Sequence, residues 1–141
     1  MSTDTSTDLA GLVGSIYAAF GRGDVPFILD QLAADVEWEP GIRTTNVPWL
    51  QPGTGAAHVA AFFTALGESV DFENFEPVTI AASGNEVVSV IREAATVRRT
   101  GKAIPEDLYV HFWRFGADGK VASFRHIGDW HRHEVAWQLD T

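Results

Sequence analysis

The sequence contains no cysteine and only one methionine among its 141 residues. The absence of cysteine excludes disulfide bonds, thiolate metal sites and a cysteine nucleophile. Long apolar runs are also absent, because none approaches the roughly 20 residues of a membrane-spanning helix. The opening MSTDTSTD has neither the basic nor the apolar part of a secretion signal, and we expect residues 1–7 to be a disordered lead. These features predict a cytoplasmic protein with no membrane partner.

Basic residues are scarce as well. Ten lysines and arginines stand against 19 aspartates and glutamates, which gives a formal net charge of -9. Such an acidic surface repels phosphate backbones, so nucleic acid is not an expected partner. The chain has no glycine-rich phosphate-binding pattern between a strand and a helix, and we predict that it works without a cofactor. Without an internal repeat or a linker, residues 8–141 are expected to form a single domain.

Apolar residues recur at helical spacing in the first half of the chain. Between Leu9 and Phe20 they fall at i, i+3, i+4, i+7, i+8 and i+11, which predicts a helix with one buried face. Asp24 can cap a second helix, and a third helix over 59–66 is expected to end at Gly67. The sequence therefore predicts three helices before the main run of strands.

The period of the pattern changes from 3.6 to 2 after the third helix. A short strand over 35–39 precedes a long loop over 40–54, in which Trp49 is a candidate lid over a pocket. Four further strands are expected near residues 70–82, 86–99, 106–115 and 120–131. The segments between these four strands contain the Gly, Asn and Asp residues typical of hairpin turns. Helices followed by an antiparallel meander predict an α+β domain.

One of the predicted strands is apolar on both faces. Tyr109, His111, Trp113 and Phe115 alternate with Leu108, Val110 and Phe112. Helices can cover only one side of such a sheet, so the other side needs a different partner. We therefore expect a homodimer that forms through the sheet.

Two stretches resemble a known family. Residues 16–40, IYAAFGRGDVPFILDQLAADVEWEP, and residues 110–129, VHFWRFGADGKVASFRHIGD, are similar to the opening and to the final hairpin of SnoaL-like proteins. These proteins belong to the nuclear transport factor 2-like superfamily, which includes bacterial ketosteroid isomerase. The resemblance implies a cone-like roll, in which a curved antiparallel sheet and three helices surround a pocket for an apolar small molecule. The same fold carries isomerases, polyketide cyclases, epoxide hydrolases and binding modules.

The resemblance also implies three catalytic residues. His111 falls where the isomerases carry the acid of their oxyanion hole, and His126 falls at the position of the catalytic aspartate of the SnoaL cyclases. Asp129 matches the aspartate that ends the last strand in many relatives. On a flat strand residues 126 and 129 point to opposite faces, and a bulge at Gly128 would bring them to the same pocket.

Some positions depart from the family patterns. The isomerase tyrosine of the first helix corresponds to Ile16, and the isomerase base corresponds to Glu39 only after a one-residue gap. These differences argue against steroid isomerisation. The Arg-x-Asp motif of limonene-type epoxide hydrolases appears only as Arg92-Glu93-Ala94, which leaves the charge relay of that reaction incomplete.

Two classes of function remain open at this point. The first is a cofactor-free isomerase, aldol cyclase or lyase for a hydrophobic carbonyl compound, with Asp129 or His126 as the base and His111 as the donor to the oxyanion. The alternative is a ligand-binding or dimerisation module on the same fold, and an epoxide hydrolase-like enzyme is a third hypothesis. Exchanging His111 for Phe should abolish turnover in an enzyme but leave binding intact in a binding module.

Aromatic and acidic side chains are the expected lining of the pocket. Flat rings supply a large apolar contact area, and a glutamate on the inner face of a strand needs a functional reason to be there. The predicted substrate-binding residues are Trp38, Trp49, Phe63, Glu93, Tyr109 and Phe124. The run from His126 to His133 also has a spacing that could bind zinc, but a solvated strand edge is the simpler interpretation, and no metal site is predicted.

Overall fold

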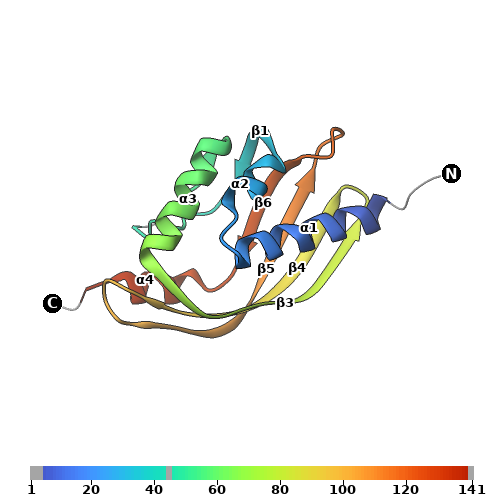
Figure 1. Ribbon diagram of the computed structural model, residues 1–141. Coiled ribbons are helices and arrows are strands. Elements are labelled where there is room, and N and C mark those ends of the chain that lie inside the picture. The colour runs from blue at the N-terminus through green and yellow to red at the C-terminus, as the bar shows by residue number, and fades with distance from the viewer. Residues whose placement is uncertain (1–4, 44–45, 140–141) are drawn as a thin grey trace.

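The computed structural model describes residues 5–43 and 46–139, so residues 1–4 of the expected lead lie outside the described part (Figure 1). Helices and strands follow the predicted order as far as β6, except that the short strand β2 lies in the predicted loop over 40–54. The helices are α1 (Thr5–Gly21), α2 (Val25–Asp30), α3 (Ala56–Ser69) and α4 (Trp130–Trp137). The strands are β1 (Leu32–Trp38), β2 (Gly53–Thr54), β3 (Val70–Ser83), β4 (Glu86–Val97), β5 (Ala103–Phe115) and β6 (Val121–Ile127).

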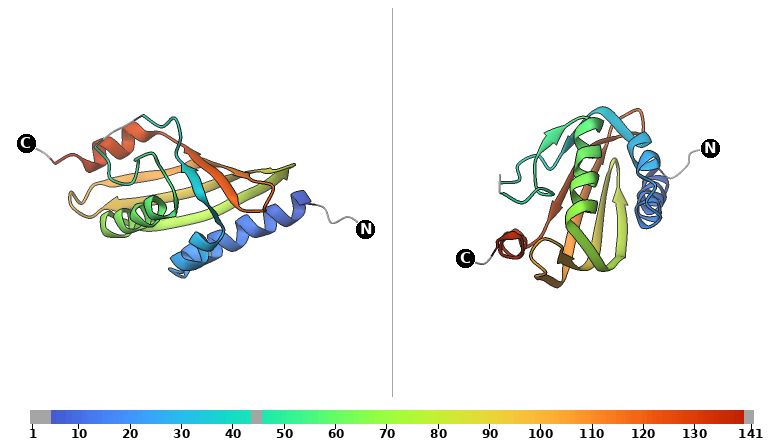
Figure 2. Two further views of the ribbon diagram at one scale, coloured as in Figure 1. Left: turned by 90° about the horizontal axis from the view of Figure 1, so that it is seen from above. Right: turned by 60° about the vertical axis from the view of Figure 1, so that its left-hand side comes forward.

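The six strands form one curved sheet in the order β2-β1-β6-β5-β4-β3. Strands β3 to β6 are an antiparallel meander, as the turn chemistry predicted, and β1 joins it by pairing parallel to β6. Figures 1 and 2 show α1 and α3 on the same side of this sheet, with α2 between them in the chain. The α+β prediction with a cone-like roll is therefore confirmed.

Local signals account for the helices of the first half. The Asp24 side chain accepts a hydrogen bond of 3.1 Å from the Phe27 N–H, which caps α2 as predicted, and proline lies in the first turn. The helix α3 does not end at Gly67 but continues to Ser69. A single glycine weakens a helix by only about 1 kcal/mol, and packing of the apolar face can offset that cost.

The end of the chain differs from the prediction. The last strand does not reach residue 131, because β6 ends at Ile127 and α4 follows from Trp130. In this helix Trp130, His133 and Trp137 stand at i, i+3 and i+7, the spacing of one helical face. Trp130 and His131, which were predicted to end the last strand, therefore belong to a short helix. The helix packs against the β4–β5 hairpin, where the Thr100 hydroxyl donates to the Ala136 carbonyl.

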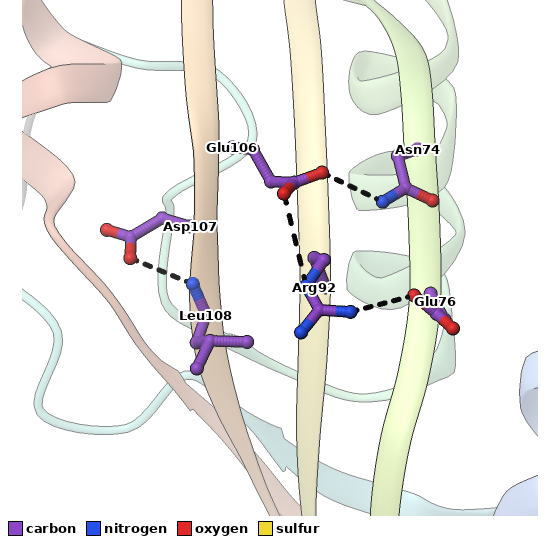
Figure 3. A network of polar contacts seen from close by, with 6 residues as sticks. All are labelled: Asn74, Glu76, Arg92, Glu106, Asp107 and Leu108. Carbon is purple, nitrogen blue, oxygen red and sulfur yellow. Dashed lines mark hydrogen bonds and ion pairs between the residues drawn. The ribbon is translucent and has the colours of Figure 1, made fainter.

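The two faces of β5 are divided as the sequence predicted. Tyr109, His111, Trp113 and Phe115 are buried on the inner face, beneath the helices. On the outer face Leu108 is 52% exposed. Charged residues lie beside it on this face. Arg92, which pairs with Leu108 across β4 and β5, contacts both Glu76 and Glu106 in the network of Figure 3.

Candidate active site

A cavity of about 80 Å³ lies between the inner face of the sheet and the helices α1 and α3. Most of its wall is aromatic or aliphatic, and five polar side chains interrupt it. These five are Tyr17, Glu93, Tyr109, His126 and His133. Pockets for drug-sized ligands measure about 300 Å³ or more, so this volume suits a small ligand or requires side chains to move aside for a larger one.

The first polar group at the cavity is Tyr17 on α1. Its hydroxyl accepts a hydrogen bond of 3.1 Å from the Trp113 indole and lies 2.8 Å from Nδ1 of His111. Burial raises the pKa of the Tyr17 phenol and, together with the nearby His126, holds the pKa of His111 well below its ordinary value. The Tyr17 phenol therefore keeps its proton, and the imidazole of His111 stays neutral.

The second polar group is His126 on β6, which pairs with Glu39. One carboxylate oxygen of Glu39 accepts a hydrogen bond of 2.9 Å from the backbone N–H of His126, and the other contacts Nδ1 of the same residue. The Glu39 side chain is only 1% exposed. A carboxylate oxygen that contacts Nδ1 orients the imidazole ring, so Nε2 is the ring nitrogen that Glu39 does not contact.

Backbone geometry contributes to this pairing. Glu39 has φ 57°, and it is the non-glycine residue with positive φ in the described part of the chain. Residues other than glycine rarely adopt this conformation, and such strain concentrates at functional sites. Here the turn after β1 points the Glu39 carboxylate towards His126 rather than into solvent. The hydrogen bond from the Glu39 N–H to the Phe124 carbonyl, 2.7 Å long, holds the turn against β6.

Glu93 on β4 is the only carboxylic acid among the residues that line the cavity. Burial raises the pKa of Glu93 from its ordinary value of 4.5 to about 7, and the nearby His126 limits this rise. A group with this pKa is present in both protonation states near neutral pH, so it can give or take a proton.

Tyr109, His133 and Trp49 form a third polar group at the α4 end of the cavity. The Trp49 indole donates a hydrogen bond of 3.0 Å to Nδ1 of His133, and Nε2 of His133 lies 2.8 Å from the Tyr109 hydroxyl. Burial, together with the nearby His126, lowers the pKa of His133 to about 3. Trp49 thus lies buried in the cavity wall and is hydrogen-bonded to α4.

The structure brings together most of the residues that the sequence suggested. Those that line the cavity are Trp38, Trp49, Phe63, Glu93, Tyr109, Phe124 and His126. His111 is buried next to them but does not line the cavity. It packs against Phe124 and His126, with ring centroids 5.2 Å and 5.6 Å away. His111 therefore contacts residues of the cavity wall without being part of that wall.

Asp129 lies outside the site. It is the residue before α4, its side chain is 49% exposed, and its carboxylate pairs with Arg132 at 3.3 Å. The expected bulge at Gly128 is not needed, because β6 has already ended there and the chain turns into α4. Gly128 instead provides space for the Tyr109 ring, which a side chain at that position would overlap. His126 is the base candidate that remains of the predicted pair.

The histidines whose spacing could bind zinc are separated in the structure. His131 has a side chain that is 81% exposed, whereas His133 is buried between Trp49 and Tyr109. Within residues 5–43 and 46–139 no three histidine, cysteine or acidic side chains lie close enough to share an ion. The same part of the chain contains no helix with the length and hydropathy needed to cross a membrane.

Three site residues were not identified from the sequence. Tyr17, one position after the residue matched to the isomerase tyrosine, is the α1 side chain that reaches His111. Glu39 was noted only as a distant match, and His133 was assigned to a solvated edge. The Glu-Pro-Gly turn after a strand was the available signal for Glu39, whereas His133 required recognition of α4 as a helix.

Comparisons with known proteins agree with this fold. Three solved structures cover nearly the whole chain. An NTF2-like protein from Burkholderia xenovorans is 28% identical, with a TM-score of 0.82 over 94% of this chain and 98% of its own. A putative polyketide cyclase from Xanthomonas campestris is 19% identical, with a TM-score of 0.77 over 93% and 97% of the two chains. TerC, co-crystallised with polyporic acid, is 21% identical, with a TM-score of 0.73 over 88% and 93%.

The last two structures are similar to this chain in fold alone. A comparison with curated protein sequences finds no match. The model of the SnoaL-like domain family matches residues 13–124, which include the second half of α1 and the sheet as far as Phe124 in β6. Because this match spans well over half of the sequence, the chain belongs to the SnoaL-like domain family.

Proposed function

We propose that the protein is a cofactor-independent enzyme that removes a proton next to the carbonyl group of a small hydrophobic compound, as isomerases, aldol cyclases and lyases do. The observation that carries this proposal is the pairing of His126 with a buried Glu39 at the wall of an otherwise apolar cavity. A carboxylate that orients the ring from one nitrogen leaves the other nitrogen to take a proton, which is the arrangement of a general base.

In this reaction His126 takes the proton from the carbon next to the carbonyl, and the electron pair of that C–H bond moves onto the carbonyl oxygen as an enolate. Glu39 stabilises the imidazolium that forms, because its carboxylate already contacts Nδ1. Glu93, with its pKa near 7, returns a proton to the enolate at another carbon or at the oxygen. The apolar rings around these groups exclude water, which strengthens each electrostatic interaction.

The fold comparisons support a small-molecule ligand. TerC was crystallised with polyporic acid, and another neighbour is described as a putative polyketide cyclase. Neither protein assigns a substrate to this chain. The cavity of about 80 Å³ favours a compound with a single ring over a steroid-sized one.

Hydrogen exchange tests the proposal without knowledge of the natural substrate. The protein is incubated in deuterated water with acetophenone and with cyclohexanone, and proton NMR follows the loss of the signal next to the carbonyl. We expect exchange above the buffer rate, and His126→Gln should lower it about 100-fold. His131→Gln, which changes an exposed histidine outside the cavity, is the matched control. Equal rates for wild type and His126→Gln would contradict the proposal.

We also propose that the protein forms a homodimer through the outer face of the sheet. Several apolar side chains lie exposed on neighbouring strands there, including Leu108 at 52% and Ile127 at 53%. Val88 and Phe112, paired across β4 and β5, connect them into one patch. A monomer rarely leaves such a patch to water. Analytical ultracentrifugation should show a dimer, and Leu108→Asp should shift it to a monomer; a monomeric wild type would contradict this assembly.

A further inference from the structure

The Tyr109 hydroxyl has a proton that its protein contacts do not use. The indole of Trp49 can only donate a hydrogen bond, so Nδ1 of His133 must accept it. A neutral imidazole that accepts at Nδ1 carries its proton on Nε2, and this nitrogen lies 2.8 Å from the Tyr109 oxygen. His133 is therefore the donor in that contact, and Tyr109 is the acceptor.

The remaining proton of the Tyr109 hydroxyl needs an acceptor. Within the described residues no other hydrogen bond to this hydroxyl is formed, and Tyr109 lines the cavity. A buried hydroxyl that accepts from one side is favoured to donate to the other. The acceptor must then come from whatever occupies the cavity.

Tyr109 lies between the two titratable groups Glu93 and His126 in the order of the strands. Tyr109 lies on β5, between β4, which carries Glu93, and β6, which carries His126. Tyr109 pairs with Ile91, two residues from Glu93, and His111 pairs with His126. The three polar side chains therefore occupy neighbouring positions on one face of three adjacent strands. A compact ligand can meet all three at once.

Glycine at position 128 leaves the space that the Tyr109 ring occupies. The Tyr109 ring lies over Gly128, and a Cβ atom there would overlap the ring and contact Trp130. Trp130 in turn packs against both Tyr109 and His133, with ring centroids 5.8 Å and 5.0 Å away. The phenol and the imidazole that orients it are thus held in place by α4, which keeps the hydroxyl preorganised.

We infer that the Tyr109 hydroxyl is the hydrogen-bond donor that binds the carbonyl oxygen of the ligand and stabilises the enolate formed when His126 removes a proton. His133 is its positioning residue and Trp49 sets the tautomer of His133. The stabilising role rests on the proposed function, whereas the binding of a carbonyl oxygen does not.

The ionisation states agree with this role. Burial, which Glu93 reinforces, raises the pKa of the Tyr109 phenol, so the phenol keeps the proton that it must donate. Burial keeps His133 neutral, with its pKa at about 3, so the tautomer imposed by Trp49 persists at neutral pH. Tyr17 differs, because its hydroxyl already contacts both Trp113 and His111.

Infrared spectroscopy tests the hydrogen bond directly. Acetophenone labelled with ¹³C at the carbonyl is bound to the protein, and its C=O stretching frequency is recorded. We expect a shift to lower frequency than in an apolar solvent, and Tyr109→Phe should abolish this shift. Tyr17→Phe, the same change at the other tyrosine of the chain, should retain it. Loss of the shift in Tyr17→Phe but not in Tyr109→Phe would overturn the inference.

Exchange kinetics distinguish this inference from the proposed function. Tyr109→Phe should slow deuterium exchange into acetophenone about 100-fold, as expected when one donor to an oxyanion is removed. A protein that shifts the carbonyl frequency through Tyr109 but does not catalyse exchange would retain the donor and refute the enzyme. Exchange that depends on His126 but is unaffected by Tyr109→Phe would retain the enzyme and refute the donor's stabilising role.

The tautomer of His133 gives a readout that needs no ligand. In protein labelled with ¹⁵N, the imidazole of His133 should show a protonated Nε2 and an unprotonated Nδ1. Trp49→Phe removes the indole donor and should allow the other tautomer to appear. A protonated Nδ1 in the wild type would overturn the inference, because His133 would then accept the proton of Tyr109.

Discussion

Two buried networks of the same three residue types, one reaching α1 and the other α4, differ in the order of their contacts. In the network on α1, the Tyr17 hydroxyl stands in the middle, between the indole of Trp113 and the imidazole of His111. In the network on α4, the imidazole of His133 stands in the middle, between the indole of Trp49 and the hydroxyl of Tyr109. Each network thus contains one tyrosine, one tryptophan and one histidine, but the central residue is tyrosine in the first and histidine in the second.

The order decides what each network can offer to a ligand. A central tyrosine uses its hydroxyl on both sides, and its histidine is buried away from the cavity wall. A central histidine uses both ring nitrogens, and the tyrosine at the end keeps one proton. The Tyr17 network therefore acts as part of the core, whereas the Tyr109 network presents a directed donor.

The largest expected effect concerns Glu93, which belongs to neither network. Below a pH of about 4.5 Glu93 is protonated in both the folded and the unfolded chain. As the pH rises towards 7, the unfolded chain releases this proton first, so the raised pKa in the folded state lowers the free energy of unfolding. The side chain of Glu93→Gln cannot ionise and does not have this pH dependence. The free energy of unfolding of the variant minus that of wild type should therefore increase by about 3 kcal/mol between about pH 4 and pH 8.

Urea unfolding at several pH values measures this difference. Both His111 and His133 have lowered pKa values, and their ionisation contributes equally to the two proteins, so it cancels in the comparison. A stability difference that does not change with pH would show that Glu93 lacks a raised pKa. The same carboxylic acid could then not act as a proton donor near neutral pH.

The next effect separates the two tyrosines. Tyr17→Phe leaves both Trp113 and His111 without their partner, which should cost roughly 2 to 3 kcal/mol of unfolding free energy. Tyr109→Phe leaves only His133 without a partner and should cost about 1 kcal/mol. Urea unfolding of the two variants at neutral pH provides the values. Equal costs would contradict the difference between a central and a terminal hydroxyl.

A smaller effect is expected from a change that disturbs only the α4 network. In Gly128→Ala the added methyl group would overlap the Tyr109 ring and contact Trp130, and such overpacking should cost about 2 kcal/mol. Gly11→Ala on α1 is the control, because no atom lies near its added methyl group and alanine favours the helix by about 1 kcal/mol. Equal stability of Gly128→Ala and wild type would mean that Tyr109 does not pack closely over Gly128.

Much of the fold could be predicted, because the fold depends on periodicity. The apolar spacing of α1, the cap at Asp24 and the turn residues between β3 and β6 are local signals, and each predicted its element. The end of the chain could not be predicted in the same way. The segment over 130–137 carries tryptophan and histidine at positions compatible with either a strand or a helix, and packing against the β4–β5 hairpin selects the helix.

The candidate site was predicted where alternation along one strand determines which way a side chain points. This rule placed both Tyr109 and His111 on the inner face of β5. It could not show that His111 packs against Tyr17 and Phe124 and does not line the cavity. The rule failed for Asp129, because it assumed a strand where the chain turns into α4. Errors therefore arose where an element ended.

The sequence by itself determined the class of fold, the apolar character of the pocket and the residues on each face of the central strands, because these depend on spacing between neighbours in the chain. Only the tertiary structure decided that Glu39 pairs with His126, that Glu93 is buried near His126 and that Trp49 donates to His133. These contacts join residues from different elements, up to 87 positions apart for Glu39 and His126. Proton positions and pKa values depend on such contacts and on burial, and no local pattern encodes either.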